Sequence, residues 1–165
     1  MKYENGVLKA RGLASIEWII DAPRFARAIP GIIAFDEKDV VSEEVRRIEQ
    51  CVIRFMLGSS QLMAGQEQEL QTLMSDTQKL NESAASIGHN ISIEIIGHTD
   101  TEGSEAMNER LSADRASRVF SMLGASSVNN NFFAARGAAS REPVSVEASE
   151  ASKQLNRSVS FRVRR

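Results

Sequence analysis

The chain has 165 residues, of which 42% are apolar and 25% are charged, and its formal net charge is −2. This composition is typical of a folded globular protein and excludes a disordered chain. Acidic and basic residues are interleaved, without a basic patch that contains aromatic residues, so we expect no nucleic-acid partner.

The single cysteine, Cys51, excludes an internal disulfide, and we expect it to be a buried or half-buried structural thiol. No stretch of sequence is long and apolar enough to span a bilayer, and the N-terminus does not resemble a signal peptide. The protein is therefore expected to be cytosolic, or to have its export signal or membrane anchor outside this chain.

Residues 1–45 are predicted to form a small strand–helix–strand module. Pro23 is expected to start or to break the helix, and Pro30-Gly31 to form a turn. In chain order we predict a strand at 7–12, a helix at 16–29, an extended run at 32–41 and a capped helical turn or linker at 42–45. This order, with a glycine after the first strand and Pro-Gly before the next, resembles the second half of a BON module over about residues 6–41. An unrelated extension is the alternative.

Residues 46–165 alternate strands and helices, which predicts helices packed on one sheet. We predict strands at 51–57, 91–96, 132–136 and 156–164, helices at 66–87 and 104–123, and a loop at 137–152. The first helix is expected to end at Gly88, and its apolar stripe consists of Leu70, Leu73, Met74, Thr77, Leu80, Ala84 and Ile87. The basic residues near the end of the chain are interpreted as the solvated face of an edge strand: Arg157, Arg162, Arg164 and Arg165.

The loop at 97–104 leaves a buried strand and leads into a helix that carries an arginine on its apolar face. Arg115 lies four residues after Leu111 and four before Val119. A buried guanidinium is costly unless a carboxylate or a ligand anion meets it, and Asp100 is the nearest candidate in sequence. The two groups could bind a zwitterion, the carboxylate taking an ammonium and the guanidinium a carboxylate. Alternatively, they could pair with each other and tie the loop to the helix.

This region contains a specific set of residues at fixed spacing: Gly97-His98-Thr99-Asp100, Gly103-Ser104, Asn108, Leu111-Ser112 and Arg115-Ala116, followed by Gly137, Pro143 and Asn156-Arg157. The set resembles the signature of the OmpA C-terminal domain family over about residues 51–164. The resemblance implies an α+β fold, a β-α-β-α-β sandwich with its helices packed on one mixed sheet. It also implies non-covalent binding of peptidoglycan, in which Asp100 and Arg115 bind the ammonium and carboxylate of diaminopimelate. By the same match, Thr99, Asn108, Leu111 and Arg157 line or brace the pocket.

Three positions depart from the pattern of that family. Met107 stands where an aromatic residue is frequent, and Ala139 replaces a usual glycine. Ser158 replaces a second arginine, which predicts the loss of one charged contact at the rim of the pocket.

An enzyme is disfavoured because the sequence contains no nucleophile elbow, no glycine-rich phosphate loop and no pair of carboxylates with distinct roles. The only histidines are His89 and His98, and there is no cysteine cluster, so we expect neither a metal site nor a cofactor. His98 is interpreted as a residue at the end of a strand whose ring hydrogen-bonds locally.

These observations predict a non-catalytic domain of the periplasm or cell envelope that binds the diaminopimelate-containing stem peptide of peptidoglycan and anchors its protein to the cell wall. The alternative is a protein–protein interaction module with the same fold, in which Asp100 and Arg115 form a structural ion pair. Homodimerisation is compatible with either. If the domain binds peptidoglycan, we expect Asp100→Ala or Arg115→Ala to abolish binding and to leave the fold nearly intact.

Overall fold

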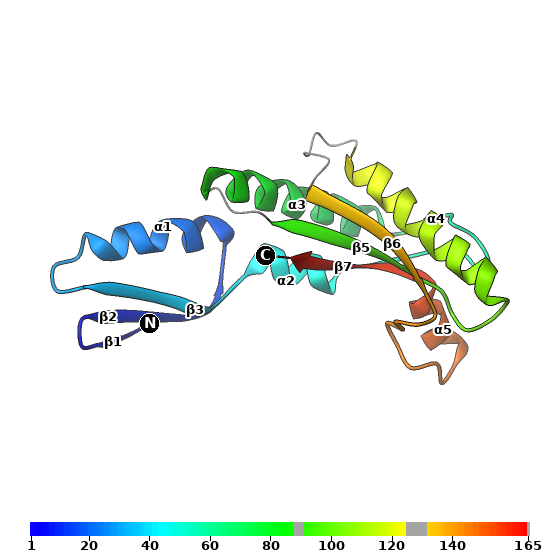
Figure 1. The fold of residues 1–165 in the computed structure, drawn as a ribbon, viewed down its shortest axis with the longest axis horizontal. Coiled ribbons are helices and arrows are strands. Elements are labelled where there is room, and N and C mark those ends of the chain that lie inside the picture. Colours follow the sequence, from blue (N-terminus) through cyan, green and yellow to red (C-terminus); the bar gives the residue numbers. More distant parts are fainter. Residues whose placement is uncertain (88–90, 125–131, 165) are drawn as a thin grey trace.

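The computed structural model describes residues 1–87, 91–124 and 132–164 (Figure 1). These residues form a three-stranded sheet near the N-terminus and a four-stranded sheet in the rest of the chain. The elements, in chain order, are β1 (Lys2–Glu4), β2 (Val7–Ala14), α1 (Ile16–Arg27), β3 (Ala34–Ser42), α2 (Glu43–Gln50), β4 (Val52–Arg54), α3 (Glu67–Ile87), β5 (Ser92–His98), α4 (Glu105–Gly124), β6 (Phe133–Ala139), α5 (Glu150–Asn156) and β7 (Ser158–Arg164). Gly88, His89 and Arg165, which entered the sequence predictions, lie outside the described residues.

The N-terminal unit contains the predicted strand, helix and strand, and adds the short strand β1. Asn5 and Gly6 both have positive φ angles, 49° and 80°, and connect β1 to β2 as an antiparallel hairpin. An Asn-Gly pair favours this kind of turn. The strands β2 and β3 are parallel, and α1 forms the crossover between them.

Helix α1 begins at a serine cap and continues through its proline. The Ser15 hydroxyl accepts a hydrogen bond from the Trp18 amide at 3.3 Å, which satisfies one of the free N–H groups of the first turn. The expectation that Pro23 starts or breaks the helix is wrong, because Pro23 lies inside it. Burial of Ala22 and Ala26 on either side of Pro23 favours the helix despite the backbone hydrogen bond that a proline cannot donate.

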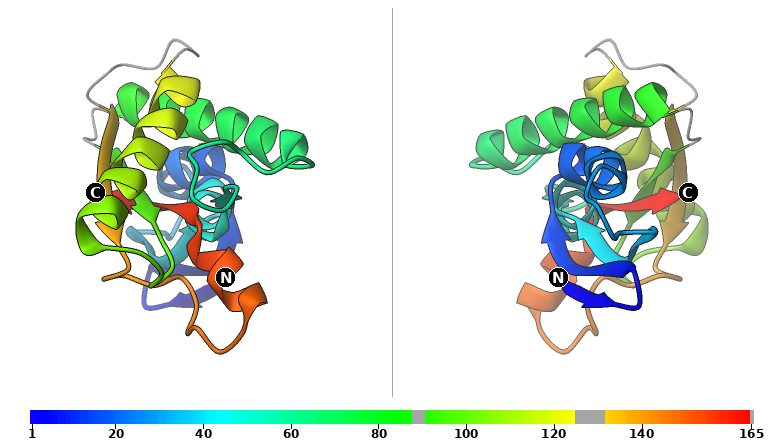
Figure 2. Two further views of the ribbon diagram at one scale, coloured as in Figure 1. Left: turned by 90° about the vertical axis from the view of Figure 1, so that its right-hand side faces the viewer. Right: turned by 90° about the vertical axis from the view of Figure 1, so that its left-hand side faces the viewer.

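The larger sheet has the strand order β4-β7-β5-β6, with β5 and β6 parallel and the other pairs antiparallel. It is therefore the predicted mixed sheet, and α3 and α4 lie over the same face of it (Figures 1 and 2). The interpretation of residues 156–164 as an edge strand is wrong, because β7 lies between β4 and β5. The predicted loop at 137–152 is shorter than expected, because β6 extends to Ala139 and α5 begins at Glu150.

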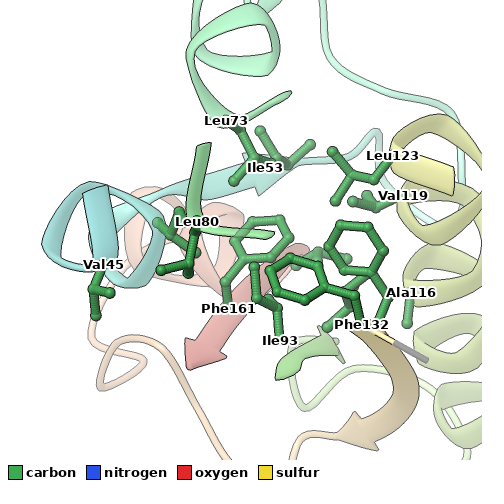
Figure 3. Packing of buried hydrophobic residues seen from close by; sticks show 14 of the residues in the cluster. Val45, Ile53, Leu73, Leu80, Ile93, Ala116, Val119, Leu123, Phe132 and Phe161 are labelled. Atoms are coloured by element: carbon green, nitrogen blue, oxygen red, sulfur yellow. The ribbon is translucent and has the colours of Figure 1, made fainter. Parts of the chain in front are cut away.

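The hydrophobic core lies between this sheet and its helices (Figure 3). Leu73 and Leu80 of the predicted α3 stripe are buried there, against side chains of the sheet and of α4 such as Ile53, Phe161 and Val119. The same cluster extends to Ile16 of α1 and to Val45 and Ile48 of α2. The N-terminal unit thus shares part of its packing with the larger sheet.

Two glycines allow α4 to lie unusually close to the sheet. A Cβ atom added at Gly97 would lie 1.9 Å from the backbone oxygen of Ser112, and one added at Gly137 would lie 2.8 Å from the Ala113 nitrogen. The loop that leaves β5 consequently emerges directly beside the first turns of α4, which is where the candidate site lies.

Candidate functional site

A pocket of about 470 Å³ opens beside the loop between β5 and α4. The N-terminal half of α4 forms one wall, and the segment that follows β4 forms another. All six residues predicted to contact or brace a ligand line this pocket: Thr99, Asp100, Asn108, Leu111, Arg115 and Arg157. The remaining lining residues are Leu57, Gly58, Glu102, Gly103, Met107, Arg110 and Asp114.

Arg115 projects from the inner face of α4 and is 0% exposed. Its Nε donates to the carbonyl oxygen of Ser59 at 3.0 Å, Nη1 to that of His98 at 2.7 Å and Nη2 to that of Met56 at 3.3 Å. The guanidinium carbon also lies 5.5 Å from the centroid of the Phe55 ring. A guanidinium has five N–H groups, so one on each terminal nitrogen has no acceptor among the described residues.

The positive charge of Arg115 has no carboxylate within ion-pair distance in the part of the chain that the structure describes. Burial lowers the pKa of Arg115 to about 10, opposed by the negative charge of Asp100 nearby. The side chain therefore stays charged at neutral pH. A buried cation whose hydrogen bonds all go to neutral carbonyls favours an anion as an additional partner.

Asp100 is buried and forms its ion pair with Arg157, not with Arg115. The Arg157 Nη1 donates to the Asp100 Oδ2 at 2.9 Å, and its other terminal nitrogen contacts Glu150 and Gln154 of α5. The ion pair between Asp100 and Arg115 that the sequence allowed as an alternative does not form, because Asp100 pairs with Arg157 instead. The Oδ1 atom of Asp100 accepts no hydrogen bond from a described residue, so the carboxylate keeps capacity for a donor in the pocket.

Hydrogen bonds from Asn108 of α4 fix the conformation of the loop between β5 and α4. The Asn108 side-chain amide donates to the backbone oxygens of Asp100 and Glu102 at 3.3 and 3.0 Å. Thr99 is 1% exposed, and its hydroxyl oxygen has no hydrogen-bond partner among the described residues. Because Thr99 lines the pocket, this hydroxyl adds a neutral polar group to the charged groups of Asp100 and Arg115.

The face that α4 buries differs from the one predicted. Leu111, predicted on the apolar face with Arg115 and Val119, is only half-buried, whereas the buried set comprises Asn108, Ser112, Arg115, Ala116, Val119 and Leu123. The close approach of α4 to Gly97 and Gly137 requires a small residue at the contact, and Ser112 meets that requirement. The prediction that Arg115 faces inward is confirmed.

The three departures from the family pattern fall at different places. Met107 is 69% exposed at the mouth of the pocket. Ala139 has a φ of 52°, a conformation that glycine adopts at lower cost, which accounts for glycine being usual there. Ser158 is fully buried on β7 and does not itself line the pocket.

The structure places the other reactive side chains in structural roles. His98 lies at the end of β5 with its Nε2 2.8 Å from the Ser160 hydroxyl, which confirms its local hydrogen bond. Cys51 is half-buried, and burial raises the pKa of its thiol to about 11. Within the described ranges, no three histidine, cysteine, aspartate or glutamate side chains are grouped so as to hold a metal ion.

Two parts of the site were not predicted from the sequence: the pocket wall that follows β4, and the contacts of α5 with Arg157. Leu57 and Gly58 line the pocket, and the carbonyls of Met56 and Ser59 hold Arg115. These residues precede Arg115 by more than 50 positions. Backbone carbonyls leave no residue-type signal in a sequence, so this part of the site could not be identified from it.

The sequence model of the OmpA family matches residues 54–157, and the chain belongs to this family. Over 67 residues the chain is 39% identical to outer membrane porin F of Pseudomonas fluorescens, a match that covers 41% of this chain and 21% of the porin. The chain thus corresponds to about a fifth of the length of that relative.

Two examples of solved structures with a similar fold come from bacteria. The peptidoglycan-associated lipoprotein from Burkholderia pseudomallei has a TM-score of 0.60 at 23% identity, covering 72% of this chain and 93% of its own. The C-terminal domain of MotB from Helicobacter pylori has a TM-score of 0.53 at 19% identity, covering 70% and 84% respectively. In this chain, no helix among the described residues has the length and apolar character needed to cross a membrane.

Proposed function

We propose that the pocket beside α4 binds the stem peptide of peptidoglycan non-covalently, through the amino acid end of a diaminopimelate side chain. The observation that carries this proposal is the fully buried guanidinium of Arg115, which has no carboxylate partner among the described residues and shares its pocket with the carboxylate of Asp100. Diaminopimelate offers the complementary pair of groups, because it ends in an ammonium and a carboxylate on one carbon atom.

The roles of the individual groups follow from their free hydrogen-bonding capacity. The carboxylate of the ligand would accept the two remaining N–H groups of Arg115, one from each terminal nitrogen, and neutralise its charge. The ammonium of the ligand would donate to Asp100 Oδ1, and the Thr99 hydroxyl would complete the site. Leu57, Leu111 and Met107 supply apolar surface for the methylene groups of the ligand.

The biological role proposed for this binding is anchoring, without catalysis, of a cell-envelope protein to the cell wall. Membership of the OmpA family supports it, as does the similar fold of a lipoprotein that is described as peptidoglycan-associated. Location in the periplasm or cell envelope belongs to the same proposal, with any membrane anchor outside this chain.

The test is calorimetric titration of the chain with a soluble stem peptide that contains diaminopimelate. A peptide with lysine at the same position is the matched ligand, since it lacks only the terminal carboxylate. Arg115→Lys is the informative variant because it keeps the positive charge but removes the paired N–H donors with which a guanidinium binds a carboxylate. Arg118→Lys, at an exposed position one turn along α4, is its control.

The proposal predicts saturable binding of the diaminopimelate peptide, at least about tenfold weaker binding of the lysine peptide, and a similar loss in Arg115→Lys but not in Arg118→Lys. Equal affinity for the two peptides would contradict the assignment of Arg115 to the terminal carboxylate. Absence of binding by the folded wild-type chain would overturn the proposal and favour an OmpA-like protein-interaction module.

A further inference from the structure

Helix α1 and the turn after it carry a row of apolar residues in which Trp18, Phe25 and Ile29 are exposed and Ala22 is buried between them. Trp18, Ala22 and Phe25 of α1 follow one another at intervals of four and three residues, the spacing of contacts between paired helices. Ile29 lies four residues further on, in the turn after Arg27, where its amide donates to the Ala26 carbonyl oxygen at 3.1 Å. Phe25 is 61% exposed and Ile29 is 51% exposed. These four residues line a groove of about 300 Å³ beside α1, together with Leu8 of β2 and Phe35 of β3.

This row is distinct from the side of α1 that packs within the chain. Ile16 and Ile20 contact the main hydrophobic cluster, near the N-terminal end of α1. In Figure 1 the C-terminal half of α1 lies at one end of the molecule, away from α3 and α4. Contiguous exposed apolar patches mark interaction surfaces, and the exposed side chains of this row lie together along one groove.

The charges on α1 are divided between its two halves. Glu17 and Asp21 lie in the first half, Arg24 and Arg27 in the second, and all four are exposed. None of them forms an ion pair with another residue in the part of the chain that the structure describes. A second α1 laid antiparallel against the first would therefore meet opposite charges, whereas a parallel one would meet like charges.

We propose that this groove is a homodimer interface, in which α1 of a second copy packs antiparallel along α1. This arrangement places Ala22 opposite the partner's Phe25, so that a small side chain makes room for a large one, and it places Trp18 opposite the partner's Ile29. It also brings Asp21 beside the partner's Arg24. Two-fold symmetry repeats each of these contacts, as expected of an interface between identical chains.

The test is sedimentation equilibrium of the whole chain and of a charge-reversal series. Asp21→Arg and Arg24→Asp each place like charges in contact twice across the proposed interface, and each is expected to weaken dimerisation about tenfold or more. The double variant D21R/R24D restores opposite charges and is expected to restore dimerisation. Phe25→Glu is expected to abolish it, and Arg118→Asp, on the exposed side of α4, serves as the control.

Far-UV circular dichroism establishes that each variant is folded before its mass is measured. A wild-type chain that stays monomeric up to its solubility limit would overturn the proposal. A dimer that resists Phe25→Glu, or that responds equally to Arg118→Asp, would place the interface elsewhere. If each single charge variant weakens the dimer but the double variant does not recover, the antiparallel arrangement is wrong.

Discussion

The guanidinium of Arg115 donates to three backbone carbonyls, so its removal is expected to affect folding as well as binding. Arg115→Ala would leave those carbonyls without this donor and create a cavity beside Phe55. We expect it to lower the free energy of unfolding by about 3 kcal/mol, measured by urea denaturation. This replaces the expectation from the sequence that the fold would stay nearly intact.

The matched control for that measurement is Arg118→Ala, at an exposed position on the same helix. A surface substitution of this kind is expected to change the free energy of unfolding by less than about 0.5 kcal/mol. Similar stabilities of the two variants would show that the hydrogen bonds of Arg115 contribute little to the fold.

His98 is expected to make stability depend on pH in the weakly acidic range. Burial lowers the pKa of His98 in the folded state, whereas in the unfolded chain a histidine titrates near pH 6.5. As the pH falls below about 6.5, the unfolded chain takes up a proton that the folded chain does not, so the free energy of unfolding decreases. Urea denaturation between about pH 7.5 and about pH 5 would measure this decrease.

The variant His98→Asn tests the assignment, because asparagine can hydrogen-bond to Ser160 but does not titrate. It is expected to remove most of the decrease in this range. Glu94 and Glu142, whose pKa values are lowered mainly by Arg136, contribute a separate loss below about pH 4.5. An unchanged decrease in His98→Asn would exclude His98 as its source.

At the scale of the elements, the contact between α4 and the sheet depends on Gly97. A methyl group there would lie 1.9 Å from the Ser112 backbone oxygen, which cannot move without shifting the helix. Gly97→Ala is therefore expected to lower the free energy of unfolding by about 3 kcal/mol or more. It should also weaken any ligand binding, because Arg115 and the loop with Asp100 would move apart.

Gly124→Ala is the control for this prediction, since no described atom lies within 4 Å of an added methyl group at Gly124. At the end of a helix, alanine is expected to be neutral or slightly stabilising relative to glycine. Thermal unfolding of both variants separates the effects. A Gly97→Ala variant as stable as the wild type would contradict the close contact between α4 and β5.

The strands and long helices could be predicted from the sequence because their apolar residues recur at regular intervals. The stripe of α3 and the inward position of Arg115 are examples. The short helix α5 was missed because seven residues with one leucine carry no periodic pattern. Its capping box also uses Ser152 instead of the usual glutamate or glutamine.

Most of the candidate site could be predicted from one stretch of sequence, and the resemblance to the OmpA family added Arg157 but not its pairing with Asp100. Thr99, Asp100, Asn108 and Arg115 lie within 17 consecutive positions, and the structure brings them to one pocket. The actual partner of Asp100 is Arg157, which lies 57 positions away. Long-range pairing of this kind depends on the strand order of the sheet, which local patterns do not encode.

At the scale of the whole molecule, Glu44 connects the N-terminal unit to the larger sheet. Its buried carboxylate accepts a hydrogen bond from the Ile16 amide at 3.0 Å and one from the Ser42 hydroxyl at 2.8 Å. Arg47, on the same helix, forms two hydrogen bonds to Asp76 of α3 at 2.7 and 2.8 Å. The division into residues 1–45 and 46–165 predicted from the sequence therefore falls inside α2.

We expect Glu44→Ala to loosen the N-terminal unit selectively, because the first amide of α1 loses its partner. Hydrogen exchange measured by mass spectrometry should then be faster in α1 and β3 and unchanged in α4. Glu43→Ala, which removes an exposed neighbour, is the control. Faster exchange throughout the chain in Glu44→Ala would indicate that the two parts open together.

The strand order of the larger sheet also has a consequence for biosynthesis. Strand β7 lies between β4 and β5, although both are synthesised long before it. Until β7 has left the ribosome, β4 and β5 lack the strand that pairs with both of them. Asp100 also lacks its ion-pair partner Arg157. The nascent chain is therefore expected to acquire its central sheet and its pocket in one late step, after translation has passed residue 164. Before that point it would depend on its surroundings, such as chaperones, to keep the exposed core from aggregating.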